Sequence, residues 1–209
     1  FCLDRAGLTG PDGPTHNGVF DIPYMRLFPR MVVMAPGDDA DVKPMLHFAL
    51  GHNHPTSIRY PKTALETIER EVKPVQLGRA EVIEQGDDIV LMAFGTFLGE
   101  CARAAEILRA KGLSVGLVNA RFAKPIDATL LVEQAKSAKL IVTLEDGAVT
   151  GGFGTGALET LAEHGVRTPI VRLGWPDRFV GHATDVKTLR AANGLSPDQM
   201  LATVKAALK

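Results

Sequence analysis

The sequence predicts an α/β protein in which helices cover both faces of a mostly parallel sheet. Nearly continuous apolar runs recur in its second half, as at 88–94 (DIVLMAF) and 139–144 (KLIVTL), and such runs are typical of strands buried on both faces. Helical patterns with polar caps separate these runs. Strands that alternate with helices of this length form parallel sheets.

The first third of the chain differs in composition and in the order of its expected elements. A glycine- and proline-rich opening is followed by an extended run at 31–34, a helix at 39–50 and a strand at 56–60 that ends before a proline. Acidic residues at Asp38 and Asp39 are expected to cap the helix. Pro44 is expected to shift the start of the helix or to kink it.

The charged, proline-containing segment at 62–78 is interpreted as an ordered crossover to a second unit. That unit is expected to contain strands at 79–84, 88–94, 114–119, 139–144 and 168–173, and helices at 97–111, 127–137 and 155–164, with a last helix capped by Ser196.

Composition excludes several classes of protein. The 209 residues carry a net charge of −1 with no basic stripe, so a nucleic-acid partner is not expected. No apolar run approaches the roughly 20 residues that span a bilayer, and no membrane partner is expected. Cys2 and Cys101 match no metal or redox spacing, and both are interpreted as reduced, buried thiols of a cytoplasmic protein.

The segment from Asp4 to Gly18 (DRAGLTGPDGPTHNG) carries the strongest functional signal. It places Asp4, Arg5, Asp12 and His16 among glycines and prolines, which turn the backbone sharply and oppose helix. We therefore expect a loop whose polar side chains face a small anionic ligand. Phe1 stands where an initiator methionine is usual, and the chain is expected to begin partway through something larger.

Arg5 and Arg59 are the candidate anion-binding residues. If the fold brings them together, their planar guanidinium groups can hold a phosphate monoester through paired hydrogen bonds. We call this arrangement the arginine clamp. A lone arginine at a strand end is usually a surface ion pair, so residue type alone leaves both interpretations open.

His16 and Asp12 are the candidate catalytic residues. An imidazole can donate to, or exchange a proton with, a substrate hydroxyl or carbonyl near neutral pH. Asp12 can orient that imidazole or accept from a hydroxyl. A histidine satisfied by a backbone carbonyl and an aspartate that closes a turn explain the same residues equally well.

Three further motifs have structural explanations beside functional ones. His52 and His54 lack acidic or thiol neighbours in sequence, which favours a polar loop over a metal site. The GGFGTG run at 151–156 can cradle a phosphate at a helix start, or it can allow close helix packing. Glu145 and Asp146 form either a site pair or a cap and an interface bridge.

Several motifs together resemble one family. DRAGLTGPDGPTHNGVFDIPYMR, APGDDAD, TSIRYP, NARFAKPID, LEDGAVTGGFG and LGWPDRF are similar, in order and spacing, to the 1-deoxy-D-xylulose-5-phosphate synthases, which are transketolase-like thiamine diphosphate enzymes. DGPTH alone is typical of transketolases generally. DRAGLTG and the Phe20-Asp21 pair favour the deoxyxylulose enzymes.

The resemblance implies a domain organisation and a reaction. Residues 1–70 resemble the C-terminal part of a parallel-sheet pyrimidine-binding domain, and residues 71–209 resemble a transketolase C-terminal α/β domain. The family condenses pyruvate with D-glyceraldehyde 3-phosphate, with loss of CO2, for isoprenoid (terpenoid), thiamine and pyridoxal synthesis. The family uses thiamine diphosphate and Mg2+, and the resemblance implies that the protein is a homodimer.

The resemblance also assigns roles to residues. Arg5 and Arg59 fall where the family binds the aldehyde phosphate, and Asp12 and His16 fall where it contacts substrate hydroxyls and the reacting carbonyl. Asn17 stands where His or Gln is common. The GDG…N motif that binds diphosphate and Mg2+ has no counterpart here. This chain alone is therefore expected to bind no thiamine diphosphate and to be inactive.

Two alternative functions remain open at this point. A transketolase proper or the β subunit of a 2-oxoacid dehydrogenase shares the same pair of domains. A non-catalytic dimerisation module is the alternative from another class, because fold alone does not specify function.

Overall fold

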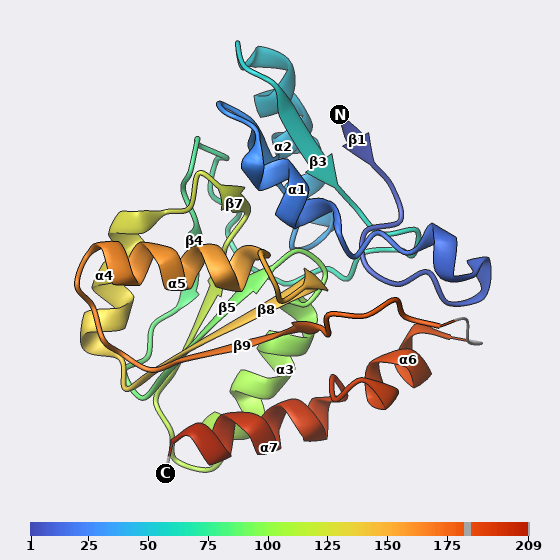
Figure 1. The fold of residues 1–209 in the computed structure, drawn as a ribbon. Helices are drawn as coiled ribbons and strands as arrows, with labels where there is room; N and C mark the ends of the chain where they lie inside the picture. Colours follow the sequence, from blue (N-terminus) through green and yellow to red (C-terminus); the bar gives the residue numbers. More distant parts are fainter. Residues whose placement is uncertain (182–184, 209) are drawn as a thin grey trace.

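The structure, a computed structural model, describes residues 1–181 and 185–208 and contains two sheets that lie end to end (Figure 1). The first sheet has the order β1-β3-β2-β7 and the second the order β4-β6-β5-β8-β9. The strands are β1 (Cys2–Leu3), β2 (Val32–Met34), β3 (Thr56–Arg59), β4 (Glu81–Glu84), β5 (Ile89–Phe94), β6 (Val115–Asn119), β7 (Phe122–Lys124), β8 (Leu140–Ala148) and β9 (Ile170–Trp175).

The second sheet confirms the predicted α/β class. Its strands β5, β6, β8 and β9 are parallel, and only the edge strand β4 is antiparallel. Helices α4 (Ala128–Ser137) and α5 (Phe153–Glu163) cover one face, while α3 (Leu98–Arg109) and α7 (Pro197–Ala207) cover the other (Figure 1). Each face buries its own apolar cluster, which is why the strands read as continuous apolar runs.

The first sheet is assembled from both halves of the chain. Strands β1, β3 and β2 are parallel, but the neighbour of β2 on its other side is β7, which runs antiparallel with Val33 opposite Lys124. Residues 122–124 belong to the second unit, at 71–209, in the domain organisation that the resemblance implies. The structure therefore interleaves the two units, because a strand of the second completes the sheet of the first.

Two short helices lie outside the elements expected from sequence. Helix α1 (Asp21–Leu27) and helix α6 (Val186–Ala192) have seven residues each, too few for a helical period to stand out. Helix α2 (Asp39–Gly51) begins where expected, so Pro44 does not shift its start. Asp38 occupies the N-cap position, yet its side chain does not cap the helix.

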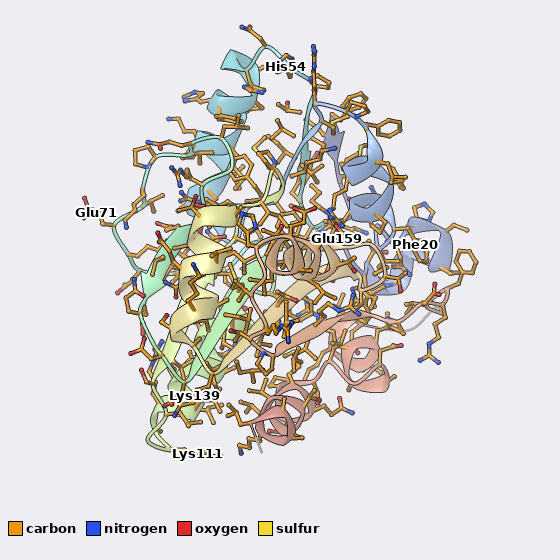
Figure 2. The ribbon with its side chains drawn as sticks, turned by 60° about the vertical axis from the view of Figure 1, so that its left-hand side comes forward. Phe20, His54, Glu71, Lys111, Lys139 and Glu159 are labelled. Carbon is orange, nitrogen blue, oxygen red and sulfur yellow. The ribbon has the colours of Figure 1, made fainter. Side chains whose placement is uncertain are left out.

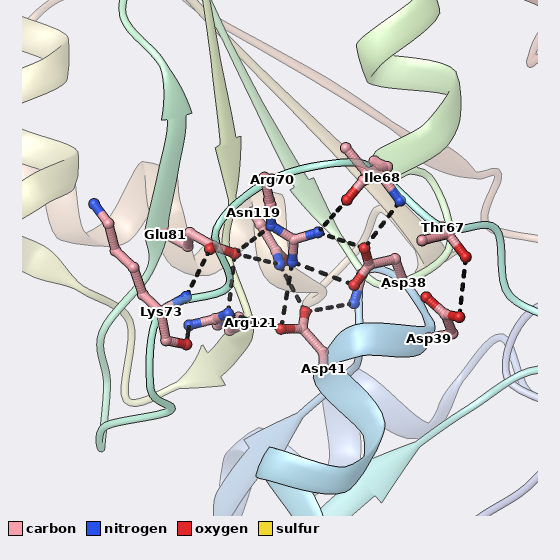
Figure 3. Close-up of polar contacts among 11 residues, drawn as sticks. Asp38, Asp39, Asp41, Thr67, Ile68, Arg70, Lys73, Glu81, Asn119 and Arg121 are labelled. Atoms are coloured by element: carbon pink, nitrogen blue, oxygen red, sulfur yellow. Dashed lines mark hydrogen bonds and ion pairs between the residues drawn. The ribbon is translucent and has the colours of Figure 1, made fainter.

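The carboxylate of Asp38 belongs instead to a buried ionic network between the two sheets (Figure 3). Arg70, in the crossover segment, pairs with Asp38 and, at 3.0 Å, with Glu81 of β4. Arg121, between β6 and β7, donates to Asp41 of α2 at 2.8 and 3.0 Å and lies 2.9 Å from Glu81.

The side chains at the centre of this network are shielded from solvent. The three carboxylates and Arg121 are all buried, and Asn119 donates to Asp41 at 2.7 Å. Charges removed from water are tolerated only when partners and hydrogen bonds compensate them. The network therefore ties α2 and the crossover to the second sheet at a fixed position.

We expect Asp41→Ala to lower the free energy of unfolding by about 3–5 kcal/mol, because it leaves the Arg121 guanidinium buried without its main partner. Urea denaturation measures this loss. The control is Glu66→Gln, which breaks the exposed pair with Arg103 and should cost at most about 1 kcal/mol. Equal losses in the two variants would contradict a dominant role for the network.

Candidate functional site

The predicted loop at 4–18 is a closed structure with a narrow base. Gly7 donates its N–H to the carbonyl of Gly18 at 2.9 Å, and Gly18 donates to the carbonyl of Arg5 at 3.0 Å. A Cβ at Gly18 would lie 2.5 Å from that carbonyl oxygen, so only glycine allows this approach. Asn17 also holds the loop together, because its side-chain oxygen accepts from the backbone of Thr9.

Arg5 and Asp12 meet in a charged cluster on this loop. Arg5 donates through Nε to Asp12 at 3.1 Å and also pairs with Asp4. Lys62, just after β3, donates to the other oxygen of Asp12 at 2.6 Å. Hydrogen bonds lower the pKa of Asp12, so this carboxylate stays ionised; the bond from Lys62 has the larger effect and the bond from Arg5 the smaller. Sequence reasoning missed Lys62, although it follows the RYP motif by a single position.

His16 is exposed on the loop. Its Nδ1 lies 3.3 Å from the hydroxyl of Thr15. Within the part of the chain that the structure describes, His16 makes no hydrogen bond to Asp12. The structure therefore places the two candidate catalytic residues on one loop without pairing them.

Arg59 is buried, with 2% of its surface exposed, so it is not the surface ion pair that a strand-end arginine usually forms. It donates through Nε and Nη2 to the carboxylate of Asp21 at 2.8 and 3.1 Å. Nη2 also donates to the carbonyls of Gly18 and Asp146, each at 2.8 Å. Burial works to lower the pKa of Arg59, but the charge and hydrogen bonds of Asp21, together with the charges of Asp146 and Glu145, outweigh it, so that pKa is raised.

Arg5 and Arg59 are connected only indirectly. Among residues 1–181 and 185–208 no side chain pairs with both arginines, and their link is the backbone of Gly18, which donates to the carbonyl of Arg5 and accepts from Arg59. The Nη1 group of Arg59 has no hydrogen-bond partner within these ranges. Arg59 thus supports the base of the loop, while Arg5 lies on its surface.

The GGFGTG run is already filled by the protein's own carboxylate. Glu145, in the second half of β8, accepts the N–H groups of Phe153 and Gly154 at 2.6 and 2.8 Å, at the start of α5. A Cβ at Gly152 would lie 2.1 Å from the Glu145 carboxylate. The glycines therefore serve close packing around an internal cap, and these N–H groups are not free to hold a phosphate.

The histidines near α2 do not form a metal site. His52 stacks on Phe48 with ring centroids 5.2 Å apart, and His54 packs edge-on against His52. His54 lies at one end of the molecule, opposite Lys111 and Lys139 (Figure 2). Within the described ranges no group of three or more His, Cys, Asp or Glu side chains is arranged to hold a metal ion.

A cavity of about 450 Å3 lies behind the loop. Its wall includes Ala6, Leu8, Asp146 and Arg190, but none of the four candidate site residues lines it. The two cysteines also differ in setting: Cys101 is buried as expected, whereas Cys2 is exposed. In the described ranges, none of the helices is both long and apolar enough to cross a membrane.

This geometry suits recognition of an anion more than proton transfer. Arg5 and Lys62 lie at the loop surface, each paired with Asp12, and one edge of the Arg59 guanidinium has no partner among the described residues. Guanidinium groups bind phosphate oxygens through charge-assisted hydrogen bonds. Asp12 lies between Arg5 and Lys62 and holds both in place.

The burial of Glu145 makes the free energy of unfolding depend on pH. Desolvation raises its pKa from 4.5 to about 7, against the opposing effect of the two N–H groups and of Arg59 and Arg26. The folded protein therefore binds this proton more tightly than the unfolded chain. The resulting stabilisation is complete below about pH 4.5 and is lost as the pH rises through about 7.

We expect Glu145→Gln to remove this pH dependence, because an amide does not titrate. Between pH 5 and pH 8 the wild type should lose about 3 kcal/mol more unfolding free energy than the variant, as followed by urea denaturation. Glu159→Gln, an exposed change on α5, should follow the wild type. Parallel profiles for wild type and Glu145→Gln would contradict the raised pKa.

Comparisons with known proteins place this geometry in a family. Residues 78–200 match the transketolase C-terminal domain, and residues 1–67 match the transketolase pyrimidine-binding domain. Among solved structures, a chain titled "Split gene transketolase, inactive beta4 tetramer" aligns with a TM-score of 0.88 and 28% identity over 99% of this chain and 65% of that one. A transketolase from Campylobacter jejuni, at 16% identity and a TM-score of 0.74, shares the fold.

Curated relatives show which enzymes of this family the chain is similar to. The 1-deoxy-D-xylulose-5-phosphate synthase of Acaryochloris marina is 42% identical over 213 residues, which cover 100% of this chain and 33% of that enzyme. The corresponding synthase of Thermosynechococcus vestitus is 41% identical over 98% of this chain and 32% of its own length. The chain thus spans about a third of these relatives. It belongs to the transketolase family and corresponds to the C-terminal portion of its 1-deoxy-D-xylulose-5-phosphate synthases.

Proposed function

We propose that this chain is the C-terminal part of an enzyme that condenses pyruvate with D-glyceraldehyde 3-phosphate and releases CO2. The observation that carries this proposal is the 42% identity to a deoxyxylulose phosphate synthase along the whole chain. We further propose that the domain boundary lies near residue 70, and that the product supplies isoprenoid, thiamine and pyridoxal synthesis in the cytoplasm.

In this proposal the loop at 4–18 receives the phosphorylated aldehyde. Arg5 and the free edge of Arg59 bind its phosphate, as charge-assisted hydrogen bonds to arginine allow. His16, exposed on the same loop, contacts the reacting carbonyl, and Asp12 orients substrate hydroxyls. Arg5 and Lys62 are charged hydrogen-bond donors at the loop, which supports a phosphosugar over an acceptor that carries no phosphate.

Thiamine diphosphate with Mg2+, when bound, would supply the carbanion chemistry of this reaction. The described residues of this chain do not fit that group by themselves. The glycine-rich helix start is filled by Glu145, and no cluster of potential metal ligands exists in the described ranges. We therefore propose that the diphosphate and Mg2+ bind to another part of the enzyme and that this chain alone is inactive.

The solved relative supports the same view. This relative is a split-gene transketolase described as an inactive β4 tetramer, and 99% of this chain aligns with it. An apolar stripe on α2, formed by Val42, Leu46 and Leu50, is exposed and suits contact with a further polypeptide surface. We propose a homodimer for the complete enzyme. Because the stripe is exposed, a non-catalytic dimerisation module is the second candidate function.

The test compares this chain with the longer enzyme that contains it. Each is assayed for deoxyxylulose phosphate from pyruvate and D-glyceraldehyde 3-phosphate with thiamine diphosphate and Mg2+. We expect product from the longer enzyme and none from this chain. A cofactor-loaded longer enzyme that forms no deoxyxylulose phosphate would favour a transketolase or a 2-oxoacid dehydrogenase β subunit instead.

We expect Arg5→Ala in the longer enzyme to weaken binding of the phosphorylated aldehyde by about 1.5–3 kcal/mol for each charged hydrogen bond lost. The readout is KM for D-glyceraldehyde 3-phosphate, with KM for pyruvate as the internal reference. Arg103→Ala, a surface arginine of α3 that pairs with Glu66, serves as the matched control. An unchanged aldehyde KM in Arg5→Ala would remove Arg5 from the site.

A further inference from the structure

Asp146, in the second half of β8, is a charged side chain that the proposed chemistry leaves unexplained. Its carboxylate is buried and accepts the indole N–H of Trp175 at 2.7 Å and the hydroxyl of Thr96 at 2.8 Å. Arg190 of α6 lies 3.6 Å away. Three separate elements of the second sheet and its helices therefore fix this side chain in one place.

The same residue also touches the candidate loop. Its backbone carbonyl accepts from Nη2 of Arg59 at 2.8 Å. A Cβ at Gly7 would lie 2.0 Å from the Asp146 carboxylate, so the loop backbone rests directly against that group. Two residues further along, Ala148 donates its N–H to the carbonyl of Val19 at 2.6 Å.

Through Asp146, these contacts connect the second sheet to Arg59 and to the loop at 4–18. Trp175 and Thr96 anchor the carboxylate, the anchored residue presents its carbonyl to Arg59, and its carboxylate supports the loop at Gly7. Asp21 accepts from Nε and from the same Nη2 group of Arg59, so Asp21 and the carbonyl of Asp146 together set the direction of the edge that remains free.

We propose that Asp146 is a positioning residue for phosphate recognition, through which the C-terminal half of the chain orients Arg59 and the loop at 4–18. This inference rests on the proposed function, because it assumes that the loop binds a phosphate. Asp146 itself does not contact the substrate. Its effect should therefore appear in phosphate affinity and not in the chemical step.

The first experiment measures binding of inorganic phosphate to the 209-residue chain by calorimetry, with chloride keeping the ionic strength constant. Asp146→Ala is expected to weaken phosphate binding at least about tenfold, the effect of losing one charged hydrogen bond. Asp146→Asn keeps an acceptor for Trp175 and should remain within about threefold of the wild type. Asp88→Ala, at the opposite end of the sheet, should leave phosphate binding unchanged.

Thr96→Val provides a variant that leaves the Asp146 charge in place. It removes one anchoring hydrogen bond and should weaken phosphate binding severalfold, even if Asp146→Ala fails to fold. Thermal unfolding in chloride shows whether each variant is folded.

The outcomes separate this inference from the proposed function. A wild-type chain that does not bind phosphate would overturn the phosphate role of the loop, and the inference with it. A wild-type chain that binds phosphate, beside folded Asp146→Ala or Thr96→Val variants with equal affinity, would overturn the inference alone.

A second readout distinguishes positioning from general stability in the longer enzyme. Asp146→Ala should raise KM for D-glyceraldehyde 3-phosphate about tenfold and leave kcat, and KM for unphosphorylated D-glyceraldehyde, nearly unchanged. Equal effects on the two aldehydes would overturn the assignment.

Discussion

The buried pairing of Arg70 and Arg121 with three carboxylates is the constraint on which the remaining architecture depends. Charges in a dry interior are stable only while their partners stay in place. Because Asp38 directly precedes α2, Asp41 lies in α2 and Glu81 comes from β4, the network is complete only when the two sheets hold one relative position. The candidate loop at 4–18 is connected to the first sheet and contacts the second, so its geometry depends on their relative position.

Periodicity predicted most of the second sheet because its strands are buried on both faces and its helices are long. Asp127 and Ser196 cap α4 and α7 as their residue types indicate. The same reasoning missed β7, since three residues carry no period and their pairing with β2 spans about 90 positions of sequence. Asp38 looked like a helix cap because its usual partner is local, whereas Arg70 is distant in sequence.

The candidate site shows the same division between local and distant information. A glycine-rich loop with Arg5, Asp12 and His16 is visible in the sequence, because its turns depend on the residues themselves. Two facts depend on the fold alone: Arg59 is buried against Asp21, and Glu145 fills the helix start that the glycines leave open. Neither partner is marked by spacing, so no local pattern shows that Asp21 pairs with one edge of Arg59 or that Glu145 fills the helix start.

The interleaved strand β7 has a consequence for attempts to divide the molecule. A polypeptide that ended at residue 70 would keep β1, β2 and β3 but would bare the edge of β2, which β7 covers in the intact chain. Open strand edges pair readily with other chains and promote aggregation. The excised first unit would therefore be an insoluble or self-associating species, although the sequence assigns it a domain of its own.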